Sequence, residues 1–288
     1  PPSRTTAPAV HRTREEISRL FERKLGELPT DSIPALVAIA RKHLRAKFLC
    51  AGMGVSGANF LVAETGSVVL VTNEGNGRLG TVLPRVHLAV AGIEKVIPRM
   101  SDLPTFLRLL PRSASGQPLS SYVSILTGTR REGDAEGPER MHILLLDCGR
   151  SAILEGKYRE ILKCIRCGAC LNSCPVYQSV GGHAYGWVYS GPIGAVLTPL
   201  LVGLPEAAPL PDASTLCGAC GEVCPVKIPL PDFLLELRAD ARSQGLKTPG
   251  EIAGMKGYAG VMKRAGLLEA LERVAGLLAQ FFTKGRPV

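Results

Sequence analysis

The chain has 288 residues, of which 45% are apolar, and this is enough for about two globular domains. Its net charge is +9, but Lys and Arg are scattered and form only short pairs such as Arg130-Arg131. Nucleic-acid binders concentrate basic residues or carry a recognisable reading module, so we expect no nucleic-acid partner. The best candidate for a membrane span, Ile193 to Leu204, is shorter than the roughly 20 apolar residues required and contains Pro199. We expect no transmembrane segment, and a buried helix or loop at that position.

The first half of the chain has the pattern of an α/β domain. From Arg14 to Arg45, apolar residues recur at helical spacing, which predicts two helices broken at Pro29. Short β-branched runs bounded by turn residues then predict strands. The predicted strands are 60–62, 67–71, 86–90 and 143–146, with a tight turn at 73–77 and a surface loop at 128–140.

The pattern changes near Ser151 to short helices and cysteine-rich loops, which continue to about Gly245. The tail, Glu251 to Phe282, is helical by period and carries one apolar stripe, which we expect to pack on the cysteine-rich domain or on a partner subunit. The stripe consists of Leu267, Leu268, Leu271, Val274, Leu277 and Leu278. The fold class is therefore α/β plus mostly α, with domains predicted at 1–150, 151–245 and 246–288.

The chain has nine cysteines, and seven of them fall between positions 164 and 224. The amino-terminal residues show no secretory signal pattern, so reduced thiols and metal binding are expected rather than disulfides. Cys50 and Cys148 lie apart from the others in apolar surroundings. We predict that each is a small buried hydrophobe, with a reactive thiol as the alternative.

The first cysteine motif is C-x2-C-x2-C-x3-C-P, formed by Cys164, Cys167, Cys170, Cys174 and Pro175. Thiolates suit both zinc and iron-sulfur clusters, so the ligand type alone does not decide. Zinc sites use two cysteine pairs separated by a longer spacer. Three close cysteines followed by a fourth and a proline are typical of two-cluster ferredoxins, in which the fourth cysteine ligates the other cluster. The spacing therefore favours iron-sulfur clusters.

The second motif, C-x2-C-x3-C-P, contains Cys217, Cys220 and Cys224 and matches the first motif with its first cysteine replaced by Ser214. The crossed-ligand rule predicts two clusters. Cluster 1, a 4Fe-4S cluster, is assigned Cys164, Cys167, Cys170 and Cys224, and cluster 2 is assigned Cys174, Cys217 and Cys220. Because cluster 2 has only three thiolates, three alternatives stay open: Ser214 as fourth ligand, a non-protein fourth ligand, or a 3Fe-4S cluster.

Charged residues beside the motifs have two interpretations. Lys163, Arg166 and Lys227 lie next to the cysteines. Positive charge there would stabilise a reduced cluster and raise its potential. The alternative is that these residues are ordinary surface residues.

Other motifs give weaker signals. The string Gly52-Met-Gly54-Val-Ser-Gly57 matches the dinucleotide fingerprint, but a β-branched run rather than a helix follows it, so we expect no NAD or FAD site there. His87 and His183 are predicted to be structural rather than ligands or bases. No catalytic triad, carboxylate pair or phosphate loop stands out, so hydrolytic chemistry is not expected.

Several strings resemble the lactate utilization protein B family, in family order and over nearly the whole chain. They are Ser56-Gly-Ala-Asn-Phe60, Ala63-Glu-Thr-Gly66, Thr72-Asn-Glu-Gly-Asn-Gly-Arg78, Ala91-Gly-Ile-Glu-Lys95, the Cys164 to Pro175 motif, Gly181-Gly-His-Ala-Tyr-Gly-Trp187 and Thr215-Leu-Cys-Gly-Ala-Cys220. The resemblance implies a CoA-transferase-like α/β domain of the lactate utilization type, followed by an α-helical dicluster ferredoxin domain. Family members are considerably longer at the amino end, so residues 1–150 are expected to be the C-terminal portion of that α/β domain.

The resemblance also implies a function. The family is the iron-sulfur subunit of a cytoplasmic, three-component L-lactate oxidation system with A-type and C-type components, which passes electrons toward the respiratory chain. Membrane association would be peripheral, through those partners. Two alternatives stay open: electron transfer for another 2-hydroxy acid such as glycolate, and a structural or regulatory iron-sulfur module.

Overall fold

The computed structural model describes residues 12–283, with side-chain burial given for 12–275. Within these residues the chain forms two compact units, with the boundary between Glu236 and Leu237. The first unit combines an α/β region with short helices and loops, and the second is helical, so the expected α/β plus mostly α class is confirmed. No helix in the described part of the chain has both the length and the hydropathy needed for a membrane span. The predicted domain boundaries at 150 and 245 stay a prediction.

The chain's first helices follow the predicted pattern, α1 (Arg14–Leu25) and α2 (Ile33–Cys50). Thr13 and Glu16 form a capping box at the start of α1, so two of the otherwise unpaired amide groups at that helix end are satisfied. The Ser32 side chain caps α2. Pro29 lies between the two helices, and the predicted break is confirmed.

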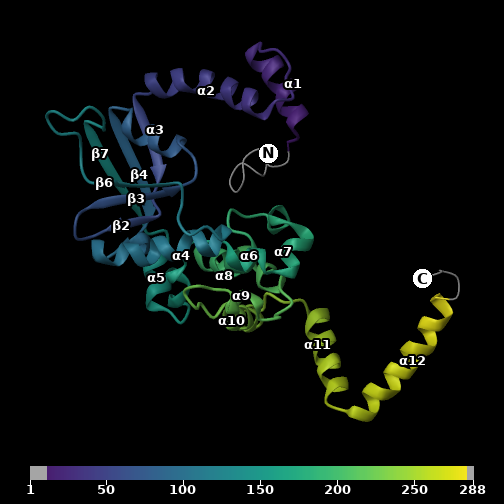
Figure 1. Ribbon diagram of the computed structural model, residues 1–288. Coiled ribbons are helices and arrows are strands. Elements are labelled where there is room, and N and C mark those ends of the chain that lie inside the picture. The colour runs from purple at the N-terminus through teal and green to yellow at the C-terminus, as the bar shows by residue number, and fades with distance from the viewer. Residues whose placement is uncertain (1–11, 284–288) are drawn as a thin grey trace. The chain divides into compact units, whose positions relative to one another are not determined.

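Two small sheets form the α/β region, and Figure 1 shows their strands gathered together. The first sheet is parallel throughout and has the order β1 (Met53–Gly57), β4 (Val86–Gly92) and β7 (Arg140–Leu146). The second is mixed and has the order β5 (Val96–Ile97), β2 (Phe60–Val62), β3 (Ser67–Thr72) and β6 (Tyr122–Leu126). All four predicted strands are confirmed, whereas β1, β5 and β6 were not predicted.

Two helices in this region were missed by the sequence analysis, α3 (Asn76–Val82) and α4 (Leu103–Ser115). The predicted tight turn at 73–77 runs directly into α3. Gly54 on β1 lies against α3, and a Cβ built at this position would lie 1.8 Å from the Gly80 carbonyl oxygen. The fingerprint-like string therefore lies on a strand that needs glycine for close helix packing, rather than at a strand-to-helix turn.

Alternation along the strands places the second sheet between two apolar clusters. Leu61 and Val68 face the first sheet, where they join Ala89 and Ala91 of β4. Phe60, one position earlier than Leu61, points to the opposite face because successive side chains on a strand alternate. The second sheet therefore has one face packed against the parallel sheet and the other face packed into a separate apolar cluster.

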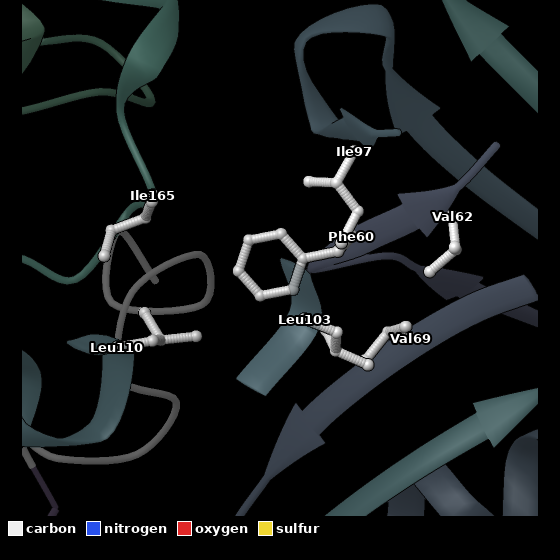
Figure 2. Close-up of a cluster of buried hydrophobic side chains, with 7 residues drawn as sticks. All are labelled: Phe60, Val62, Val69, Ile97, Leu103, Leu110 and Ile165. Carbon is white, nitrogen blue, oxygen red and sulfur yellow. The ribbon is translucent and has the colours of Figure 1, made fainter. Parts of the chain in front are cut away.

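On that far side, the cluster includes a residue from the first cysteine motif. Figure 2 shows the Phe60 ring directed toward Leu110 of α4 and Ile165, which stands between Cys164 and Cys167. Ile165 is only 5% exposed. The cysteine loop is therefore anchored by its apolar side chain in the core of the α/β region.

The rest of the first unit consists of short helices and loops, with one well-buried helix among them. That helix, α8, covers most of the stretch 193–204 that was predicted to be a buried helix or loop. Its residues Gly191 to Pro199 are all buried, which confirms the prediction for 193–199, whereas Val202 is exposed. The helices of this region are α5 (Arg150–Glu155), α6 (Ala169–Asn172), α7 (Pro175–Val180), α8 (Gly191–Val202), α9 (Ala219–Glu222) and α10 (Leu230–Ser243), and the last of these crosses the boundary between the units.

The second unit contains α11 (Pro249–Met262) and α12 (Ala265–Thr283), so the helical tail is confirmed. Thr248 and Glu251 form a capping box at the start of α11. Within the predicted apolar stripe, Leu267, Leu271 and Val274 are exposed. The side chains of Leu277 and Leu278 lie outside the described residues, and packing of the stripe on another surface stays a prediction.

The interpretation of the two isolated cysteines was wrong. Cys50 and Cys148 are both exposed rather than buried. Cys50 is the last residue of α2, and Cys148 has a φ of 44° in the turn between β7 and α5. Helix ends and turns bring side chains to the surface even when the neighbouring sequence is apolar.

We predict that Ile165→Ala destabilises the protein by about 2–4 kcal/mol, because it leaves a cavity where α4, the second sheet and the cysteine loop meet. Urea denaturation under anaerobic conditions measures the effect. Ile125→Ala is the matched control, since Ile125 is 45% exposed on β6 and should cost less than about 1 kcal/mol. Equal unfolding free energies for the two variants would contradict the role of Ile165.

Candidate iron-sulfur site

The two cysteine motifs adopt the same backbone form. Arg166 and Leu216, at equivalent positions, both have positive φ, 62° and 55°. Gly168 and Gly218, two residues later, follow with φ values of 80° and 87°, and each leads into a four-residue helix, α6 or α9. Positive φ is uncommon for residues other than glycine. The degenerate sequence repeat is therefore a structural repeat.

Backbone amide groups surround the sulfur atoms in both copies of the motif. The backbone of Ala169 hydrogen-bonds to Cys167, and that of Ala219 hydrogen-bonds to Cys217 in the same way. Cys224 Sγ accepts a hydrogen bond from the Ile228 amide at 3.4 Å. Such N–H donors stabilise negative charge on sulfur and raise the potential of a bound cluster.

The predicted ligand residues fall into two groups in space. The first group, Cys164, Cys167, Cys170 and Cys224, lines one cavity of about 540 Å³. The second group does not line this cavity. Instead, the thiolate charges of Cys174 and Cys217 both act on Cys220. Each group therefore draws cysteines from both motifs, as the crossed-ligand rule requires, while ligation itself stays a prediction.

The cysteines differ in their access to water. Burial raises the pKa of Cys170 to about 12 and raises those of Cys167 and Cys220 as well. Cys217 is exposed, and the hydrogen bond from the Ala219 backbone lowers its pKa. Metal coordination deprotonates a thiol regardless of such burial. No cysteine of the first group is exposed, whereas the second group combines buried Cys174 and Cys220 with exposed Cys217.

The thiols fit a cluster better than a single metal ion. Within the described residues, no three His, Cys, Asp or Glu side chains converge closely enough to hold one metal ion. A zinc ion requires thiolates that all lie about 2.3 Å from one point. The first group instead surrounds a cavity, and an iron-sulfur cluster provides iron atoms at several separate corners of its core.

A buried ion network adjoins the first group and was missed by the sequence analysis. The Glu94 side chain is 3% exposed. Its Oε2 forms an ion pair with Arg150 Nε at 2.7 Å, and its Oε1 accepts a hydrogen bond from Arg166 Nη2 at 3.4 Å. The Arg166 guanidinium also stacks over the Tyr189 ring, 4.4 Å from its centroid. Glu94 follows β4 and Arg166 belongs to the cysteine loop, so the network links the parallel sheet to the predicted cluster 1 ligands.

The other basic residues near the motifs differ in position. Lys95 is partly buried, and burial together with the nearby Arg166 charge lowers its pKa to about 8. Lys163 and Lys227 are exposed. Of Lys163, Arg166 and Lys227, only Arg166 therefore lines the cavity that the first cysteine group lines.

Ser214 occupies the position equivalent to Cys164 in the second copy. Its Oγ accepts a hydrogen bond from the Leu216 amide at 3.1 Å. The matching positive φ values of Arg166 and Leu216 agree with the register obtained by counting back from Pro225. A ligand role for Ser214 stays a prediction.

Neither His87 nor His183, the histidines predicted to be structural, belongs to either group of cysteines. His87 is fully buried on β4, and its Nε2 lies 2.8 Å from Ser56 Oγ on β1. Burial lowers the pKa of His87. His183 is exposed.

Comparison with known families divides the chain in the same order. Residues 3–146 match the family described as LUD domain, which is half of the chain. Residues 160–228 match the family described as 4Fe-4S dicluster domain, and this range contains all seven clustered cysteines.

Curated relatives carry the name lactate utilization protein B. The relative from Shouchella clausii is 49% identical over 258 residues, and the one from Bacillus velezensis is 50% identical over 259 residues. Each alignment covers 90% of this chain and 54% of the relative. The chain therefore spans about half the length of the curated relatives that it matches.

Among solved structures, a DUF162 family protein from Deinococcus radiodurans matches 35% of this chain and 56% of its own, with 21% identity and a TM-score of 0.26. A likeness this low carries no structural argument. The family rests instead on the domain matches and the curated relatives. The chain belongs to the LUD domain family, carries a 4Fe-4S dicluster domain, and is a homologue of lactate utilization protein B.

Proposed function

We propose that this chain is the electron-transfer subunit of a lactate-oxidising complex and holds two iron-sulfur clusters. The observation that carries the proposal is the structural repeat, which gathers cysteines from both motifs into two adjacent groups within a 4Fe-4S dicluster domain. Adjacent clusters are used for electron transfer because they form a short relay.

In this proposal cluster 1 is a 4Fe-4S cluster held by Cys164, Cys167, Cys170 and Cys224. Cluster 2 is held by Cys174, Cys217 and Cys220, with Ser214 or a non-protein group as fourth ligand, or else as a 3Fe-4S centre. The charge of Cys220 acts on Cys170, which supports a close approach between the two groups.

The clusters, when bound, supply one-electron redox chemistry. The chain holds them, donates amide hydrogen bonds to their thiolate ligands and shields the first group from water. Tyr189 and Arg166 form part of that shield. Exposed Cys217 puts the second group within reach of a partner's redox centre at the surface.

The substrate and partners come from the relatives rather than from the site. The name lactate utilization protein B supports lactate as the substrate, and the family resemblance supports its L-enantiomer as the electron source. The family resemblance adds A-type and C-type components, a cytoplasmic location and electron delivery toward the respiratory chain. The domain limits of 1–150, 151–245 and 246–288 belong to the same proposal.

We expect anaerobically purified protein to contain about seven to eight irons with matching acid-labile sulfide, and to give EPR signals that appear and vanish reversibly in a redox titration. With the A-type and C-type components added, L-lactate should reduce the clusters. Colourless protein with bound zinc would end the proposal. Reduction by glycolate but not by L-lactate would reassign the substrate, and clusters that do not cycle at physiological potentials would indicate a structural role.

The crossed ligand sets predict opposite effects for two variants. Cys174→Ser should selectively abolish or alter the cluster 2 EPR signal, and Cys224→Ser should do the same to cluster 1, because serine is a poor ligand for iron. Cys148→Ser is the matched control and should leave both signals unchanged. Loss of cluster 1 in Cys174→Ser would refute the crossing.

Ser214→Cys tests the missing corner of cluster 2. Because Ser214 stands where Cys164 stands in the first copy, a thiol there should supply a fourth ligand and yield a 4Fe-4S signal with a lower potential than the wild-type centre. EPR of the oxidised and reduced forms measures the change. Identical spectra for Ser214→Cys and the wild type would show that position 214 does not face cluster 2.

A further inference from the structure

The cavity beside the first cysteine group also lies at the carboxyl ends of the parallel strands. Gly57 ends β1, Gly92 ends β4 and Leu146 ends β7, and all three residues line the cavity. In open α/β sheets, ligands bind in the crevice outside the carboxyl ends of the strands. The strand ends therefore form the part of the cavity where a small ligand usually binds, and the first cysteine group forms the part where cluster 1 is predicted.

The charges on the wall favour an anion. Lys95, Arg150 and Arg166 line the cavity, and Glu94 is the one carboxylate among its lining residues. Arg150 is engaged, because Nε pairs with Glu94 and Nη1 donates to the Asp147 carbonyl oxygen at 2.9 Å. Before the cysteine thiolates are counted, the basic side chains of the wall therefore outnumber its carboxylates.

Two of these cations have unused donors. Arg166 Nη1 is buried and has no hydrogen-bond partner among the described residues. The Lys95 ammonium forms no hydrogen bond or ion pair with any residue in the described part of the chain. Burying a donor without a partner is costly, so an anion that accepts from Arg166 Nη1 would be favoured, and the Lys95 ammonium would add a second donor.

The cavity has room for both a cluster and a small molecule. Its volume of about 540 Å³ lies within the range of pockets that hold ligands of drug size. A bound cluster would take up the side of the cavity that Cys164, Cys167, Cys170 and Cys224 line. The strand side keeps an apolar wall that includes Val90, Leu146 and Val188, which suits a short carbon chain.

We propose that the strand side of this cavity binds a small carboxylate of the 2-hydroxy or 2-oxo acid class, with its anion held by Lys95 and Arg166. The choice of acid class rests on the proposed function, and the anion site rests on the cavity itself. The proposal concerns binding alone, with no bond made or broken. It places the ligand beside cluster 1 rather than beside the more exposed second group.

The test is isothermal titration of the anaerobically purified full chain with L-lactate, pyruvate, acetate and inorganic phosphate. Binding of L-lactate or pyruvate is expected, with acetate weaker. Lys95→Met and Arg166→Gln should each weaken binding about 10- to 100-fold, the loss of one charge-assisted hydrogen bond. Lys163→Met is the matched control: it removes a positive charge next to Cys164 but lies outside the cavity lining, so affinity should stay within about twofold.

Cluster signals in the same samples separate the two proposals. Saturating L-lactate or pyruvate should change the line shape of the cluster 1 EPR signal and leave that of cluster 2 unchanged. Iron-replete protein that binds no carboxylate at up to about 10 mM, or that binds only phosphate, would overturn the carboxylate site while leaving the electron carrier intact. Unaltered carboxylate affinity in both Lys95→Met and Arg166→Gln would also overturn the carboxylate site. It would show that the two cations only balance the negative charge of cluster 1. Iron-free protein that still binds L-lactate through Lys95 would instead fail the proposed function.

Discussion

The first cysteine group forms only because the chain folds back and places Cys224 beside Cys164, Cys167 and Cys170. Residues 171–223 intervene, and closing a loop of this length costs conformational entropy. Burial of α8 offsets that cost, because nine of its residues are removed from water. The same helix reaches the site directly, since the Ile193 backbone hydrogen-bonds to Cys170. The apolar helix α8, which resembles a short membrane span in sequence, thus packs beside the cysteine loops and holds them together.

A second constraint connects this support to the α/β region. Ile165 inserts into the apolar cluster under the second sheet, and Arg166, the next residue, pairs with Glu94 after β4. Arg166 has a positive φ, and its side chain contacts Glu94 while that of Ile165 lies in the apolar cluster. Breaking a buried ion pair leaves an uncompensated charge, so the pair fixes the position of the loop more than it adds to stability. The cysteine loop and the sheet therefore share both an apolar and an electrostatic contact.

Several features were predictable because they depend on short-range patterns. The helix break at Pro29, the four strands with β-branched runs and the cysteine spacing are all local signals. The missed elements depend on longer-range packing. Strand β1, with two glycines in five residues, has little strand propensity and forms because Gly54 allows α3 to approach closely. The exposure of Cys50 and Cys148 was also mispredicted, since local hydropathy does not reveal where a helix ends or a turn points.

By itself, the sequence determined the number and spacing of the clustered thiols and the family, because cysteine spacing and long shared strings are properties of the chain alone. It also indicated the crossed grouping through a rule of spacing. Only the tertiary structure decided what surrounds those thiols. Glu94 and Arg150 are 56 positions apart, and neither is distinctive in the sequence, yet both line the cavity beside the first cysteine group. Burial, ion pairing and the meeting of strand ends with a cysteine loop depend on contacts between distant segments, and no local pattern encodes them.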